Sequence, residues 1–257
     1  MLFVPSPCGE DGEDLHGDRG NMVRPTGHLA GHLVTHTHEI STTKKHDLRL
    51  KMQAIQATLT IKPSKTREFE ELFASGAALV HANEPDCLLY QLCKARNKPV
   101  YTVLEIYRNK SAVQTHMKNL KKNANPAMAS LLAGESIISM LEVVGNPGLK
   151  AGTPTIGIVA SMPAKNVDAL VRATVPVLDD VQAKEDGNLM YCLCKDAKGE
   201  KIVFLELYTD MAAVGHHGKT EWFKAMGKRQ RPYLRGKPHI SFLETVGVGG
   251  IQPTAKM

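Results

Sequence analysis

The chain has 257 residues, of which 42% are hydrophobic and 23% are charged, and its formal net charge is +6. This content allows one large or two small folded domains and excludes a wholly disordered chain. No apolar run approaches the roughly 20 residues of a membrane-spanning helix, and so mild a charge is not by itself a nucleic-acid signature.

Residues 1–51 are rich in Gly, His, Asp and Thr and lack a sustained apolar period, so we expect a disordered N-terminal tail. Within it, His28, His32 and His36 would share one face of a helix. Metal chelation by these three residues is an alternative, which the glycines at 27 and 31 oppose. The first strand pattern opens just after Met52, which is therefore an alternative start of the protein.

An internal repeat dominates the remaining chain. Residues 84–116 align without a gap onto residues 185–217, and 12 of the 33 positions are identical. Such self-similarity indicates a duplicated folding unit. The predicted organisation is a domain at 52–147, a linker at 148–154, a second domain at 155–248 and a tail at 249–257.

The first copy contains seven predicted elements. Alternating residues indicate a strand at 54–61, which Pro63 ends. A helical stripe follows over 69–80, with Ser64 or Thr66 as its cap. Next come two strands, at 87–94 and 100–107, which are joined by a turn. A short helix from Ser111 follows, then a helical patch at 127–132 and a last strand at 136–144.

The second copy repeats this order with local differences. Asn166 precedes its first helix, and Pro176 is expected to kink that helix because proline has no amide hydrogen. Gly199 stands in its hairpin turn. The order β-α-β-β-α-β is the ferredoxin-like arrangement, so the predicted fold class is α+β, with helices on one face of an antiparallel sheet in each copy.

A carboxylate within an apolar strand and a histidine on an apolar helix face recur in both copies. Glu105 and Tyr107 share one face of their strand, and burying a carboxylate costs several kcal/mol unless it is paired. His116 lies on the apolar stripe of the following helix and faces the sheet. We expect Glu105 to pair with His116, and Glu206 to pair with His217.

The functional interpretation of these pairs is a general base oriented by a carboxylate, with tyrosine hydroxyls as donors to developing oxyanion charge. The alternative is a buried polar pair that fixes helix register. The candidate catalytic residues are His116, His217, Glu105 and Glu206, and the candidate substrate-binding residues are Tyr90, Tyr107, Tyr191, Tyr208 and Trp222.

Other charged residues are expected to be solvated. Lys94 and Lys195 stand at strand ends, and residues 228–235 form a basic stretch. The alternative for this stretch is a rim that attracts anions.

The pattern Glu-x-Tyr-x-x-x-x-Ala-Val-x-x-His follows an apolar strand in both copies, starting at Glu105 and Glu206. It resembles the antibiotic biosynthesis monooxygenase domain of the dimeric α+β barrel superfamily, over about residues 52–248. Members usually pair as homodimers of single domains whose sheets form a barrel. The resemblance therefore implies an intramolecular dimeric α+β barrel, a pseudo-dimer within one chain that could still associate further.

The resemblance also implies a cofactor-independent monooxygenase acting on a small quinol or aromatic substrate in a pocket between sheet and helices. The family also includes haem-degrading enzymes and an isomerase of the phosphorylated autoinducer-2 signal. An isomerase of this kind, haem binding and a non-catalytic ligand-binding or scaffold module are the alternatives. Tyr107 and Tyr208 stand where the family often has Trp, and Trp222 stands where several relatives have another His.

The five cysteines form no CxxC pair and no signal-peptide pattern opens the chain, which favours the cytoplasm and free thiols. Cys93 and Cys194 are expected to be small buried hydrophobic residues.

The expected partner is a small-molecule substrate, without nucleic acid, membrane, metal or organic cofactor. One Trp for two copies means that the two sites differ chemically, and the second is favoured if one alone is active.

Overall fold

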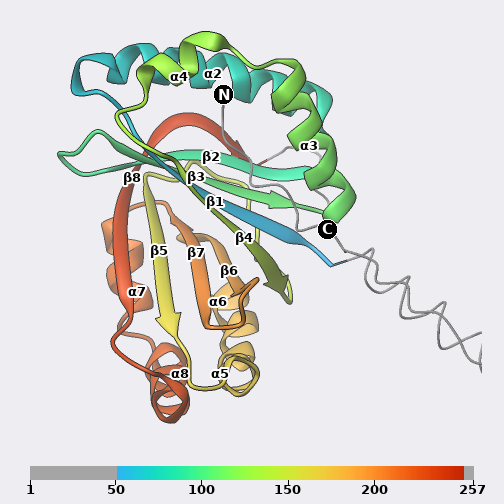
Figure 1. The fold of residues 1–257 in the computed structure, drawn as a ribbon. Helices are drawn as coiled ribbons and strands as arrows, with labels where there is room; N and C mark the ends of the chain where they lie inside the picture. Colours follow the sequence, from blue (N-terminus) through green and yellow to red (C-terminus); the bar gives the residue numbers. More distant parts are fainter. Residues whose placement is uncertain (1–50, 252–257) are drawn as a thin grey trace, which may run out of the picture.

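The computed structural model describes residues 51–251, and the expected N-terminal tail, with its histidine trio and Cys8, lies outside these residues. In the described part, eight strands close into one barrel, with helices packed on its outside (Figure 1).

The first copy has the predicted order of elements. The predicted caps Ser64 and Thr66 are wrong, because Pro63 starts a 3-10 turn that runs directly into the helix. Lys65 is the N-cap, without a side-chain cap hydrogen bond. The elements are β1 (Gln53–Thr60), η1 (Pro63–Lys65), α2 (Thr66–Asn83), β2 (Cys87–Ala95), β3 (Val100–Tyr107), α3 (Lys110–Lys122), α4 (Pro126–Leu131) and β4 (Ile137–Val144).

The second copy has the same order with more broken helices. The Asn166 side chain accepts a hydrogen bond from the Ala169 amide at 2.9 Å, and Pro176 lies in a 3-10 turn that divides the first helix, as its sequence predicts. The elements are β5 (Ile156–Pro163), α5 (Val167–Thr174), η2 (Val175–Val177), α6 (Leu178–Lys184), β6 (Asn188–Asp196), β7 (Lys201–Tyr208), α7 (Met211–His217), α8 (Glu221–Gln230), η3 (Arg231–Tyr233) and β8 (His239–Ile251).

The barrel closes through strands shared between the copies. Its order is β1-β3-β2-β8-β5-β7-β6-β4, and β4 returns to β1. The last strand of each copy therefore pairs with its own first strand and with the second strand of the other copy. β8 continues through residues 249–251, which the sequence analysis assigned to a tail, and Ile251 pairs with Leu89.

Strand alternation divides the apolar side chains into three cores. One fills the barrel and combines residues of both copies, including Leu89, Cys93 and Cys194, which confirms that these two thiols are buried. The second lies between the first sheet half and α2, α3 and α4, and the third lies between the second half and its own helices. The candidate site residues belong to these two outer layers.

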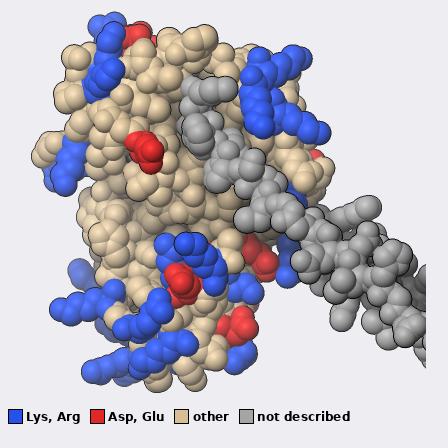
Figure 2. All heavy atoms as spheres, viewed as in Figure 1, with Lys and Arg blue, Asp and Glu red and all other residues tan. Residues whose placement is uncertain are grey.

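The charged surface surrounds the helical layers. In the face shown in Figure 2, Lys and Arg gather toward the upper and lower ends of the molecule, and few charges lie between them. Lys94, which was expected to be solvated, donates a hydrogen bond from Nζ to Glu70 at 3.1 Å.

Candidate functional site

The first candidate site lies between the outer face of the sheet and α3. Tyr90 of β2 stands directly opposite Glu105 of β3, and Cys87 stands opposite Tyr107. His116 reaches this face from α3, and its ring lies 5.5 Å from the Tyr90 ring and 5.3 Å from the Tyr107 ring. The predicted face assignments are therefore confirmed.

His116 is held by a carboxylate outside the predicted pair as well as by Glu105. Its Nδ1–H donates to Glu84 Oε2 at 2.9 Å, and Asn119 donates to the other Glu84 oxygen at 2.9 Å. Glu105 lies 3.7 Å from His116 Nε2, which suits an ion pair but is too long for a hydrogen bond. The predicted Glu105–His116 pair is therefore present as an ion pair, whereas Glu84, which directly follows α2, makes the hydrogen bond to this histidine.

Three buried ionisable groups in this site affect one another. Burial acts to raise the pKa of Glu84, but hydrogen bonds from His116 and Asn119 outweigh it and the pKa is lowered. Burial acts to lower the pKa of His116, but the Glu84 hydrogen bond and the Glu105 charge raise it overall. Burial raises the pKa of Glu105. The arrangement favours an ionised Glu84 beside a protonated His116.

The second site repeats the histidine pair in a different setting. His217 Nδ1–H donates to Glu185 Oε2 at 2.9 Å, and Trp222 Nε1 donates to Glu185 Oε1 at 2.6 Å. Among the ion pairs of the described residues, Glu185 is the partner of His217, and Glu206 is not within 4.0 Å of it. The predicted Glu206–His217 pair is therefore wrong, in contrast to the Glu105–His116 pair. His217 Nε2 is buried and has no hydrogen-bond partner in the described part of the chain.

Glu105 and Glu206 instead bind the tyrosine two residues later in their own strands. The Tyr107 hydroxyl donates to Glu105 at 2.6 Å, and the Tyr208 hydroxyl donates to Glu206 at 2.7 Å. Burial raises the pKa of Glu206. These two tyrosine hydroxyls are thus already engaged within the protein.

The remaining predicted site residues line the same layers. The Tyr90 ring stacks on Phe73 at 5.3 Å, with 4° between the ring planes. The Tyr191 ring lies 5.0 Å from His217, and its hydroxyl lies 3.9 Å from the Met226 sulfur. Trp222 contributes its indole N–H to Glu185, so it supports the histidine pair directly.

The sequence reasoning did not assign Glu84 and Glu185 to the site. The two glutamates are aligned with each other in the repeat and are one of its identical pairs, which is the signal that could have pointed to them. Each directly follows the helix that precedes the second strand of its copy. Asn188 was also missed. It takes the place of Cys87, it is 1% exposed, and its Nδ2 has no partner among the described residues.

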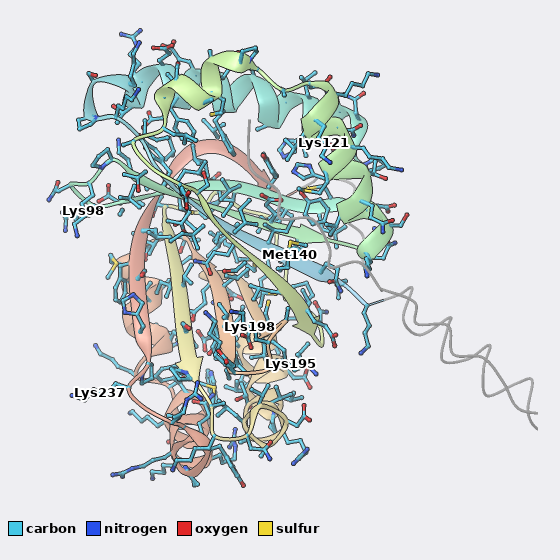
Figure 3. The ribbon with its side chains drawn as sticks, viewed as in Figure 1. Lys98, Lys121, Met140, Lys195, Lys198 and Lys237 are labelled. Carbon is cyan, nitrogen blue, oxygen red and sulfur yellow. The ribbon has the colours of Figure 1, made fainter. Side chains whose placement is uncertain are left out.

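The described surface is hollowed beside each copy. A hollow of 430 Å³ is lined mainly by residues of the second copy, among them Asp168, Lys195 and Lys198, and by Glu142 of the first copy (Figure 3). The smaller, 80 Å³, opens beside Glu84 in the first copy. Neither of these hollows is lined by His217 or Tyr191.

Within residues 51–251, no group of three or more His, Cys, Asp or Glu side chains is placed to hold a metal ion. No helix in this part of the chain is long and apolar enough to cross a membrane.

The fold and the repeated glutamate–histidine pairs define a fused α+β barrel built from two related domains. The sequence profile of the antibiotic biosynthesis monooxygenase family matches residues 52–121 and 156–229. These two regions make up more than half of the chain, and the chain therefore belongs to this family. No curated protein sequence matches the chain.

Solved structures show the same architecture over most of the chain. A protein of Fusobacterium nucleatum, proposed to be a monooxygenase, is 16% identical with a TM-score of 0.69, over 79% of this chain and 95% of its own. A Lactobacillus acidophilus protein with the same proposed activity is 16% identical with a TM-score of 0.66, over 79% and 97%. An anthrone oxidase-like protein is 12% identical with a TM-score of 0.54, over 78% and 93%. At these identities the likeness concerns the fold.

Proposed function

We propose that the protein is a cofactor-independent monooxygenase whose reactive centre is in the second copy, acting on a small quinol or related aromatic compound. The observation that carries this proposal is His217, a buried histidine held through Nδ1 by Glu185, whose Nε2 has no hydrogen-bond partner among the described residues. The lone pair of such a ring nitrogen can take a proton from a substrate, which is the role of a general base.

The surroundings of His217 suit a flat, electron-rich ligand. The Phe223 ring lies 4.5 Å from the histidine ring, and the Tyr191 ring lies 5.0 Å from it. In the first copy the Glu105 charge, 3.7 Å from Nε2, favours the protonated histidine, which cannot accept a proton. Among the described residues, the carboxylate that pairs with His217 is on the Nδ1 side, so we place the general base in the second copy.

In the proposed reaction, His217 Nε2 removes a proton from the substrate, and the electron pair stays on the substrate anion. The anion reduces dioxygen and a carbon–oxygen bond forms, which gives a peroxide. The oxygen–oxygen bond of the peroxide then breaks. With anthrone as the substrate, its methylene carbon becomes a carbonyl, one oxygen atom enters the product and the other leaves as water with the two hydrogens of that carbon, so that one dioxygen is consumed for each substrate.

The test is oxygen uptake by the full chain with anthrone and a panel of quinols. We expect His217→Asn to lower kcat by about 100-fold or more, the usual size of general-base catalysis. His239→Asn, on the exposed start of β8, is the matched control and should retain full turnover. Undiminished oxygen uptake by a His116→Asn/His217→Asn double variant would contradict the proposal.

A non-catalytic ligand-binding module is the second candidate. It is favoured by the two hollows, neither of which is lined by His217. Under this candidate the wild-type chain consumes no oxygen with any member of the panel, although a ligand of the panel still changes its Trp222 fluorescence.

A further inference from the structure

The two copies differ at the residue that begins their second strand. Asn188 pairs with Tyr208 in the same register in which Cys87 pairs with Tyr107. The Cys87 thiol donates to the Leu89 carbonyl oxygen at 3.4 Å, so its hydrogen is used within its own strand. The Asn188 amide is equally buried, but its Nδ2 has no partner among the described residues.

A second unsatisfied atom borders the same tyrosine. The His217 ring lies 5.8 Å from the Tyr208 ring, and its Nε2 also has no partner in residues 51–251. The strand register sets Asn188 opposite Tyr208. Burial and the Glu206 charge raise the pKa of Tyr208, and the Asn188 side chain acts to lower it, which agrees with this register. Asn188 and His217 therefore flank one side chain.

Both atoms are costly to leave unsatisfied. A buried donor or acceptor without a partner costs about 1–3 kcal/mol. Because Glu185 binds Nδ1 of His217, Nε2 is the nitrogen that is left to accept a hydrogen bond in the neutral ring. Asn188 Nδ2 is a donor. A ligand group that satisfies both must donate one hydrogen bond and accept another.

We propose that Asn188 is a substrate-binding residue of the second copy, and that Asn188 Nδ2 and His217 Nε2 together bind one ionisable hydroxyl group of a phenol or enol. The O–H donates to His217 Nε2, and the oxygen accepts from Asn188. When the proton moves to Nε2, the electron pair stays on the oxygen, and the Asn188 N–H stabilises the resulting oxyanion. This inference rests on the proposed function and names the substrate group that its site takes.

The first copy has an unsatisfied histidine nitrogen too, since His116 Nε2 has no hydrogen-bond partner among the described residues, but the rest of the arrangement differs. His116 Nε2 faces Glu105 at 3.7 Å, and Cys87 takes the place of the amide. One hydroxyl-binding site per chain is therefore expected.

The experiment titrates the full chain with p-nitrophenol, whose ionised form absorbs visible light. Binding is followed by this absorbance and by the fluorescence of Trp222, the single Trp of the chain. The wild type should bind one p-nitrophenolate per chain. Asn188→Cys, which introduces the residue of the first copy, should weaken binding about tenfold, which corresponds to losing one hydrogen bond. Cys87→Asn should leave the affinity and stoichiometry unchanged.

Asn188→Ser is a second variant, so that the result does not depend on how one substitution folds, and thermal unfolding reports the fold of each. Wild-type affinity in both Asn188 variants would overturn the inference. The inference would also be overturned if Asn188→Cys and His217→Asn both still bound p-nitrophenol. A stoichiometry of two p-nitrophenol molecules per wild-type chain would overturn it as well.

This outcome is separable from the proposed function, because binding needs no dioxygen. If the probe binds as described but no phenol or quinol drives oxygen uptake, the monooxygenase proposal fails and the hydroxyl site stands. If oxygen uptake occurs and Asn188→Cys leaves its KM unchanged, the hydroxyl site fails and the monooxygenase proposal stands.

Discussion

Glu84 and Glu185 hold the two buried histidines through the same nitrogen atom. Each glutamate directly follows the helix that precedes the second strand, and each accepts a hydrogen bond from Nδ1 at 2.9 Å. This bond fixes the proton on Nδ1 and turns Nε2 toward the sheet. Nε2 has no hydrogen-bond partner among the described residues in either copy, and the copies differ because it lies 3.7 Å from Glu105 in the first, whereas the ion pair of His217 in the second is made by Nδ1.

The Glu84–His116 pair makes the stability of the protein pH dependent. The raised pKa of His116 gives stability that is present at acid pH and lost as pH rises through its folded pKa. The lowered pKa of Glu84 gives stability that is lost as pH falls through its folded pKa. The pair therefore stabilises most between these two values.

Glu84→Gln removes the carboxylate charge. The free energy of unfolding should then depend less on pH on both the acid and the alkaline side, and the remaining dependence on the alkaline side should come from the charge of Glu105 next to His116. The measurement is the free energy of unfolding in urea at a series of pH values. Identical profiles for the variant and the wild type would show that the pair does not have this effect.

Trp222 supports His217 indirectly, through Glu185. Its Nε1 donates to Glu185 at 2.6 Å, and this carboxylate is 2% exposed. Trp222→Phe leaves one carboxylate oxygen without its donor and should lower the free energy of unfolding by about 1–3 kcal/mol. Tyr233→Phe, on a partly exposed tyrosine, is the control and should change it by at most about 0.5 kcal/mol. Equal effects of the two substitutions would contradict a supporting role for the indole.

At the scale of elements, a helix break accounts for the different neighbours of the two glutamates. In the first copy α3 continues past His116, so Asn119 of the next turn reaches Glu84. In the second copy α7 ends at His217, and Thr220 caps a new helix by accepting from the Phe223 amide at 3.3 Å. The new helix direction brings Trp222 to Glu185.

β8 is the element that ties the copies together most closely. Gly249 has a φ of +85°, and a Cβ at this position would lie 1.9 Å from the Tyr90 carbonyl oxygen of the neighbouring strand. Gly249→Ala should therefore lower the free energy of unfolding by about 3 kcal/mol, through both steric overlap and backbone strain.

The matched control is Gly76→Ala. This glycine lies in the exposed middle of α2, and a Cβ there meets nothing within 4 Å. The substitution should raise the free energy of unfolding by up to about 1 kcal/mol, because alanine favours the helix. Chemical denaturation measures both variants, and a change of the same sign in both would contradict this account of β8.

At the scale of the whole molecule, neither copy completes a sheet by itself. β2 needs β8, β6 needs β4, and the core inside the barrel combines side chains of both copies. Separation would expose this apolar core and the unpaired edges of two strands.

Separate expression of residues 52–147 and 148–251 should therefore yield chains that self-associate. Light scattering after size-exclusion chromatography should show dimers or larger species for each half, and mixing should recover a 1:1 complex. Two stable monomers would contradict the shared core.

The sequence alone determined the duplication, the order of elements and the faces of the strands, because these depend on local periodicity. Glu105, Tyr107 and His116 were placed on the correct faces from spacing alone, and Pro176 marked the correct helix break. The family and the α+β barrel followed from the repeated motif.

Only the tertiary structure decided which polar atoms meet. The partner of His116 lies 32 residues away at the end of another helix, and a difference of less than 1 Å separates the hydrogen bond to Glu84 from the ion pair with Glu105. The unsatisfied Asn188 amide and the passage of β8 beside β2 also became apparent only once the barrel closed. Hydrogen bonding depends on distances between segments that a one-dimensional pattern does not contain.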